Sequence, residues 1–179
     1  MAQQERKGKE YLNDFRKDLN GNYQYTGAYD RYCGAMPRKK VLALLWLLCG
    51  AAVAALAAAG FVPAPGAMGR FYVLLPYSIA LVAQISAVWA LARLTAGGDP
   101  LRRYVREQTV AKMPLRCGIS AAFAAVAAVG EWIDLFLHGA QGALIPAVSF
   151  LVLVLAGGAA TGVAAALTAR MEYTDASGE

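Results

Sequence analysis

The stretch ALIPAVSFLVLVLAGGAATGVAAALTA, residues 143–169, decides the class of this chain. It holds no charged residue, and a helix of this length rises about 40 Å, enough to cross a hydrocarbon layer of about 30 Å. Lipid cannot satisfy exposed backbone polar groups, and a run without polar alternation is unlike a barrel strand, so we interpret the stretch as a transmembrane helix.

Three more apolar stretches precede it, at about 41–62, 72–94 and 115–137. Hydrophobic residues make up 58% of the 179 positions, whereas soluble domains hold about 45 to 50% even with glycine included. The pattern predicts an all-α integral membrane protein, a four-helix bundle in contact with the lipid bilayer. The first stretch follows a long polar segment and has no cleavage site after a short apolar core, so it is not interpreted as a removable signal peptide.

Basic residues indicate the orientation. Nine of the 17 precede the first stretch and six border or fill the connection between the second and third. By the positive-inside rule, both termini and this middle connection are predicted to be cytoplasmic, in a bacterial plasma membrane. The net charge of +5 then needs no nucleic-acid partner. The predicted parts are a basic, Tyr-rich tail (1–40), a four-span domain (41–170) and a short cytoplasmic tail (171–179).

Two segments of the cytoplasmic side are predicted to form amphipathic surface helices on anionic headgroups. Glu5–Leu19 has apolar residues at helical spacing among basic ones. In the middle connection Asp99 suits an N-cap and Pro100 the first helical position, followed by a narrow apolar stripe. The alternative for both segments is a solvated basic linker.

Between the first surface helix and the first span, Asn20–Asn22 predicts a turn and Tyr23 with Tyr25 permits a short strand. This Tyr-rich segment would either cap the inner mouth of the bundle or dock another protein.

Residues that carry chemistry give little support for an enzyme. The chain has one histidine, no glycine-rich phosphate loop and no aspartate-rich magnesium motif. Catalysis by Glu131 with His138 on a lipid is the enzymatic alternative. The spacing of Cys33, Cys49 and Cys117 predicts neither a disulfide nor a thiol mechanism. We expect no enzymatic activity and no cofactor.

The third stretch contains an anomalous acid. Cys117–Gly130 holds only 14 uncharged residues, about 21 Å of helix, which is shorter than the hydrocarbon layer. Arg116 can extend back to the headgroups, but Glu131 is short and is predicted to lie below the outer boundary.

Helical projection predicts that Glu131 faces the bundle, with Asp134 and His138 successively further out. The small and polar stripe on which they lie comprises Arg116, Ser120, Ala124, Ala127, Glu131, Asp134 and His138. Two carboxyls and an imidazole are also ligand types of a divalent metal, so metal binding at these three residues stays an alternative. The alternative is that these residues form an ordinary polar helix end without a function.

Depth matching suggests companions for Glu131. Tyr77 and Ser149 lie about as many residues from the outer ends of their spans, and Gln84 shares the Tyr77 face near the midplane. These residues are candidates for a substrate or ion pathway.

Small residues at spacing four predict close helix contacts within one chain or between copies. They are Gly50 and Ala54 in the first span and Gly158 and Gly162 in the last.

Two functions follow. The first is a transporter or permeation subunit that uses the acidic site near the outer leaflet, working as a homo-oligomer or in a larger membrane complex. The second is a noncatalytic scaffold or accessory subunit whose cytoplasmic tail recruits a partner.

Overall fold

The computed structural model describes residues 15–18, 22–139 and 142–176, and it is mostly helical. Four helices are long and apolar enough to cross a membrane. Their bounds differ from the predicted spans by at most three residues. They are α2 (Arg38–Gly60), α4 (Phe71–Ala96), α6 (Met113–His138) and α7 (Leu144–Ala169).

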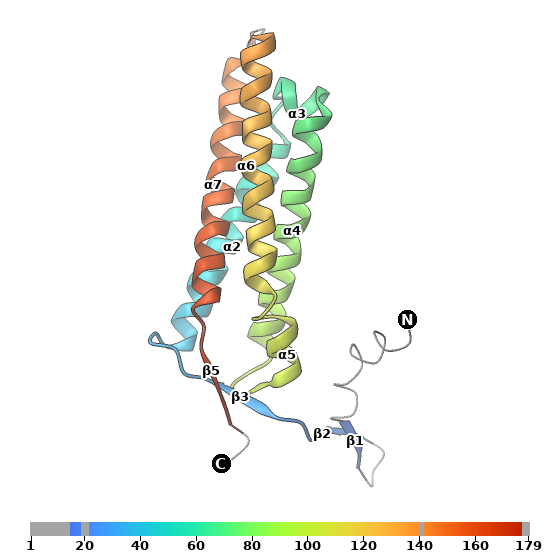
Figure 1. The fold of residues 1–179 in the computed structure, drawn as a ribbon, viewed down its shortest axis with the longest axis vertical. Coiled ribbons are helices and arrows are strands. Elements are labelled where there is room, and N and C mark those ends of the chain that lie inside the picture. The colour runs from blue at the N-terminus through green and yellow to red at the C-terminus, as the bar shows by residue number, and fades with distance from the viewer. Residues whose placement is uncertain (1–14, 19–21, 140–141, 177–179) are drawn as a thin grey trace.

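The four helices run alternately up and down as a bundle (Figure 1). α4 and α7 each pack against both α2 and α6, which places the polar face of α6 inside the bundle. One end carries the short helix α3 (Pro65–Gly69), and the other carries short strands and the helix α5 (Arg103–Gln108). We name these the α3 end and the sheet end.

Side chains fill the interior of the bundle. Leu45, Leu91 and Met113 are fully buried towards the sheet end, while Leu56 and Phe150 are fully buried towards the α3 end. Burying a large apolar side chain stabilises a fold by about 1.5 to 3 kcal/mol in water, but in lipid close packing contributes more of the stability.

Glycine permits a close approach between α2 and α7. A Cβ at Gly157 of α7 would lie 3.0 Å from Leu56 Cγ and 3.3 Å from the Ala52 carbonyl oxygen of α2. Such distances are tighter than ordinary van der Waals contact, so the α2–α7 interface depends on the missing side chain.

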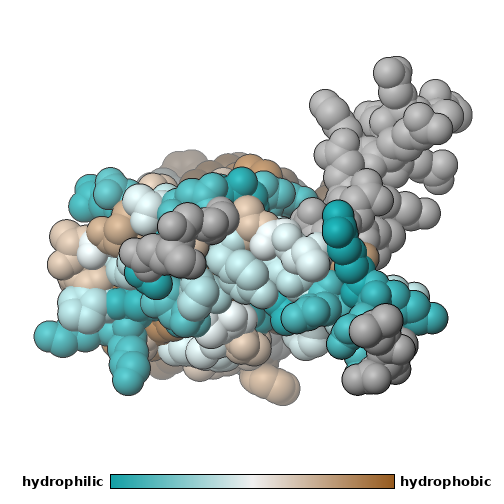
Figure 2. All heavy atoms as spheres, turned by 90° about the horizontal axis from the view of Figure 1, so that it is seen from below, coloured by the Kyte–Doolittle hydropathy of each residue, from teal (hydrophilic) through white to brown (hydrophobic). Residues whose placement is uncertain are grey.

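The segments at the sheet end pair as strands. β3 (Tyr29–Tyr32) lies between β4 (Leu101–Arg102) and β5 (Tyr173–Asp175), antiparallel to both. The N-terminal segment, the middle connection and the C-terminal segment therefore meet at one end. Hydrophilic residues are spread over this end of the molecule (Figure 2).

The surface helix predicted at Glu5–Leu19 is wrong at its described residues. Phe15–Lys17 form strand β1, which pairs antiparallel with β2 (Tyr23–Tyr25), and the rest of the prediction, apart from Asp18, lies outside the described residues. The strand at Tyr23 and Tyr25 is confirmed. Aromatic contacts favour the hairpin, since the centres of the Phe15 and Tyr25 rings lie 5.3 Å apart.

The middle connection also differs from the prediction. Asp99 is not an N-cap and Pro100 does not begin a helix, because Leu101 and Arg102 pair with β3 and the helix α5 starts at Arg103. The structure is mostly helical, as the all-α prediction expected. It differs from that prediction in its short strands.

Candidate functional site

The candidate site lies at the α3 end, where α3 covers the last turns of α6. Glu131 is 0% exposed, and no side chain of the described residues donates a hydrogen bond to either of its carboxylate oxygens. The α3 backbone at Gly66 and Ala67 lies against this carboxyl. A Cβ at Gly66 would collide with Glu131 Oε2, so a side chain at that position would force the carboxyl to move.

Local packing explains how α6 brings Glu131 here. A Cβ at Gly130 would lie 3.1 Å from the Tyr72 carbonyl oxygen of α4, so the two backbones nearly touch. Glu131 is thus level with the second residue of α4, close to the helix ends. It owes its burial to the covering α3 more than to depth in the bundle.

Asp134 lies one helical turn beyond Glu131, and its Oδ1 has three polar neighbours. Its Oδ1 accepts hydrogen bonds from the Tyr72 hydroxyl at 2.7 Å and from Arg70 Nε at 3.0 Å. His138 Nδ1 is also 3.0 Å from this oxygen. Asp134 is 4% exposed, whereas the Arg70 and His138 side chains remain 43% and 40% exposed.

The two carboxyls therefore differ in chemistry. Asp134 has a cation and a hydroxyl that stabilise its anionic form. Glu131 has no such partner, and an unpaired buried anion is costly, so its carboxyl is suited to hold a proton or a small cation. Within the described ranges, no three His, Cys, Asp or Glu side chains converge as metal ligands, so Glu131, Asp134 and His138 do not form a three-ligand centre.

The expected companions of Glu131 are engaged elsewhere. The Tyr77 hydroxyl donates to the Leu56 carbonyl oxygen at 2.7 Å and lies against Gly60. Ser149 is half-buried in a groove with Val148, Val152 and Leu153. No hydrogen bond joins Tyr77 or Ser149 to Glu131 in the described structure.

Gln84 belongs to a separate polar contact inside the bundle. Its Nε2 donates to the Cys49 carbonyl oxygen at 3.3 Å, and the Thr161 hydroxyl lies 3.1 Å from its Oε1. The Cys49 and Cys117 thiols lie in hydrogen-bonding contact beside it. These groups link α2, α4, α6 and α7, and all three cysteines are free.

The predicted packing positions divide into two groups. A Cβ at Gly158 would lie 3.1 Å from Ala124 Cβ of α6, which is a close contact within the chain. Gly50 and Gly162 would meet nothing within 4 Å, and Ala54 is exposed. For these three positions, a contact with another copy of the chain stays a prediction.

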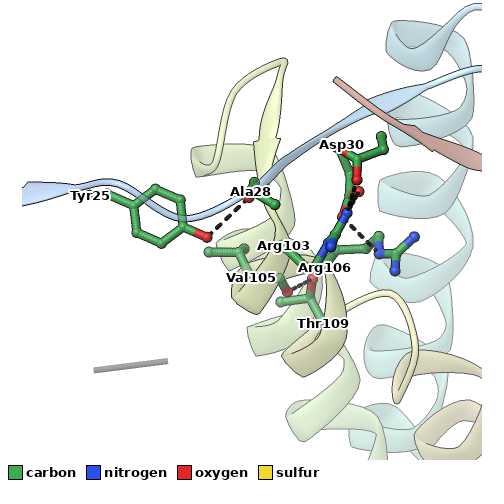
Figure 3. A network of polar contacts seen from close by, with 8 residues as sticks. Tyr25, Ala28, Asp30, Arg103, Val105, Arg106 and Thr109 are labelled. Carbon is green, nitrogen blue, oxygen red and sulfur yellow. Dashed lines mark hydrogen bonds and ion pairs between the residues drawn. The ribbon is translucent and has the colours of Figure 1, made fainter. Parts of the chain in front are cut away.

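A second polar cluster ties the sheet end together (Figure 3). Asp30 of β3 is 2% exposed, and Arg103 and Arg106 of α5 point towards it, with nitrogen–oxygen distances of 3.3 and 3.1 Å. Arg103 also binds Asp175 of β5 at 2.5 Å. These hydrogen bonds to Asp175 and Asp30 raise the pKa of the Arg103 guanidinium. The two arginines thus bind acids of the chain, which the surface-helix prediction missed.

Sequence reasoning also missed the covering helix and the partners of Asp134. Pro65 at the start of α3 was an available signal, because proline favours the first turn of a helix. Arg70 is the sole basic residue between the first two spans, which marked it for a role other than orientation. Comparisons with family models, curated proteins and solved structures found no match.

Proposed function

We propose that this chain is an integral protein of a bacterial plasma membrane, with the sheet end in the cytoplasm and the α3 end outside. The support is the set of four long apolar helices together with the large apolar side chains that they turn outwards. Leu47, Val82 and Phe136 are 69%, 66% and 86% exposed. A lipid bilayer would cover this apolar surface, whereas in water the same side chains would stay exposed to solvent.

We further propose that the protein is a transport or permeation subunit that binds a proton or small cation at Glu131. The observation that carries this function is the fully buried carboxyl that faces only the α3 backbone and has no side-chain or ionic partner among the described residues. Asp134 and Arg70 form an ion pair beside it and hold the surrounding charge fixed. Glu131 is therefore the group free to change its protonation or its bound ion.

Access to Glu131 requires a movement of α3. Gly66 is buried over the carboxyl, while Met68 and Arg70 on the same segment are exposed. The helix α3 has only five residues, so moving it breaks few helical hydrogen bonds, and Arg70 at its end would have to release Asp134. Since side chains fill the bundle interior, we place the onward path between copies in a homo-oligomer or larger complex.

Reconstitution in liposomes tests this function. Interior pyranine would report proton entry under an imposed potential, and sodium and potassium gradients would be compared in turn. We expect one of these fluxes above empty liposomes, and we expect Glu131→Gln to abolish it while the protein still folds. Unchanged flux in the Gln variant, or no flux of any of the three ions, would contradict the proposal.

A scaffold or accessory function is the second candidate, favoured by the hairpin of β1 and β2. Tyr23 on this hairpin is 73% exposed, and tyrosine contributes much contact area at low entropic cost. Stable co-purification of another protein that is lost on deleting residues 1–35 would favour this function. Loss of that protein in Glu131→Gln instead would argue against the hairpin as the docking surface.

A further inference from the structure

Two cavities lie along one side of α4, away from Glu131. The first is at the sheet end, has a volume of about 360 Å³ and is bounded by the last turn of α4 and by α5. Its lining is Arg93, Ala96, Gly97, Arg102, Tyr104 and Val105. The two guanidinium groups give this cavity the chemistry of an anion site.

Arg102 is held in place at this cavity. Its guanidinium carbon lies 5.3 Å from the centre of the Tyr25 ring, and its side chain hydrogen-bonds to Tyr104. A cation stacked on an aromatic face loses less conformational freedom when it binds a ligand. The cavity thus presents a pre-positioned positive charge.

The second cavity is a groove of about 450 Å³ between α4 and α6, nearer the middle of the bundle. Ile79, Val82 and Ile119 supply apolar walls, and Val82 is 66% exposed. Arg116 lies at the sheet-end side of the groove, where its Nη1 donates to the Ser86 carbonyl oxygen at 3.1 Å.

The two cavities are stacked on one helix face. Ile79 and Ser86 line the groove and Arg93 lines the polar cavity. These residues are seven apart, close to two full turns, so they share a face of α4. The rise from Ser86 to Arg93 is about 10 Å. A polar cavity and an apolar groove in this order match the headgroup and acyl chain of a lipid.

We propose that these cavities together bind one anionic phospholipid, with its phosphate at Arg93 and Arg102 and an acyl chain along Val82 and Ile119. Arg116 lies between them and suits the ester carbonyl oxygens. Charge complementarity selects an anionic headgroup, and the groove selects a lipid over a free anion. The site is distinct from the proposed transport function, but it rests on the proposed membrane location.

Native mass spectrometry of the full chain in neutral detergent tests the site. The probes are phosphatidylglycerol and phosphatidylcholine with identical acyl chains. An arginine near an anionic headgroup contributes about fivefold in affinity, so we expect at least about tenfold preferential retention of phosphatidylglycerol. The double variant Arg93→Gln, Arg102→Gln should lose this preference. The matched control Lys112→Gln, Arg170→Gln removes the same charge at the same end and should keep it.

Two further arms separate the groove from simple charge. Val82→Trp should fill the groove and lower phosphatidylglycerol retention, while Val152→Trp, at a similarly exposed position of α7, should not. Millimolar inorganic phosphate should not displace the lipid. Equal retention of the two lipids, equal loss in the charge control, or displacement by phosphate would overturn this inference alone. Retention of neither lipid by the unmodified protein would contradict the membrane location as well.

Discussion

The Glu131 carboxyl occupies the space that a side chain at Gly66 would need. Gly66→Ala should therefore lower the stability of the α3 end by about 1 to 3 kcal/mol, the usual cost of overpacking. Thermal unfolding in detergent measures this effect. Gly69→Ala is the matched control in the same short helix, because a Cβ there meets nothing within 4 Å.

A double-variant cycle identifies the carboxyl as the cause. In a Glu131→Ala background the clash with Oε2 is absent, so Gly66→Ala should then cost much less. An equal cost of Gly66→Ala in both backgrounds would show that α3 does not lie on Glu131.

Position 131 should accept glutamine but not lysine. Glu131→Gln keeps the size of the side chain and should fold normally, whereas Glu131→Lys buries a longer charged group beneath α3 and should prevent assembly. Size-exclusion profiles in detergent measure this difference. If Glu131→Lys also folds normally, the residue is an ordinary polar helix end.

Helical periodicity was enough to predict which side of α6 is buried. Ser120, Ala124, Ala127, Glu131 and Asp134 share one stripe in the sequence and are all buried in the structure. The partners of these residues could not be found by periodicity, because Arg70 and Tyr72 reach Asp134 from the start of α4 and the residue before it. Matching by depth could not show that the Tyr77 hydroxyl donates its hydrogen bond to a backbone carbonyl oxygen of α2.

Between helices, Gly157 and Gly162 of α7 should respond differently to the same change. Gly157→Leu should lower the unfolding temperature of a single copy, because a side chain there meets Leu56 and the Ala52 backbone. Gly162→Leu should leave that temperature unchanged, since its surroundings are open. If Gly162 lies in a contact between copies, this variant should instead lower the oligomer mass. Equal thermal behaviour of the two variants would contradict the packing described for α7.

The sheet end should depend on the buried Asp30. Asp30→Asn leaves Arg103 and Arg106 with a weaker acceptor and should cost about 1 to 3 kcal/mol, near the lower value because both arginines stay partly exposed. Faster hydrogen exchange in β3 and β5 is the expected readout. Glu107→Gln on the exposed side of α5 is the control, and equal exchange in both variants would contradict the network.

Alkaline pH should loosen β5. Burial raises the pKa of Tyr173 to about 12, above the value of about 10 expected in an unfolded chain. The neutral phenol is thus favoured in the fold, and its stabilisation is present below pH 10 and lost as the pH rises towards 12. Tyr173→Phe should reduce this dependence, as measured by thermal unfolding in detergent across that range. The same alkaline loss in the Phe variant would show that Tyr173 is not its cause.

Helix positions could be predicted from apolar length, but the strands could not. A strand of two to four residues has no periodicity to detect, and β4 and β5 form only because β3 lies between them. Tyr23 and Tyr25 were predictable because a turn signal precedes them. Phe15–Lys17 resembled a helix because three residues fit either period.

For the whole molecule, the sheet joins three segments that the charge pattern assigns to one side. An impermeant maleimide should therefore label Phe61→Cys in intact cells, since this position is at the α3 end and 88% exposed. The exposed Cys33 at the sheet end should react only after lysis. The reverse pattern would contradict the proposed orientation, and labelling of both sites in intact cells would contradict a membrane between them.

The proposed function depends on whether the Glu131 carboxyl gains and loses a proton or an ion. Infrared difference spectroscopy of the reconstituted protein observes that group, with Glu131→Gln identifying its carboxyl band. We predict a band that changes when the pH or the transported cation is changed and that is absent from the Gln variant. A Glu131 band that stays constant through both changes would contradict the account, because the carboxyl would then be a fixed part of the packing beneath α3.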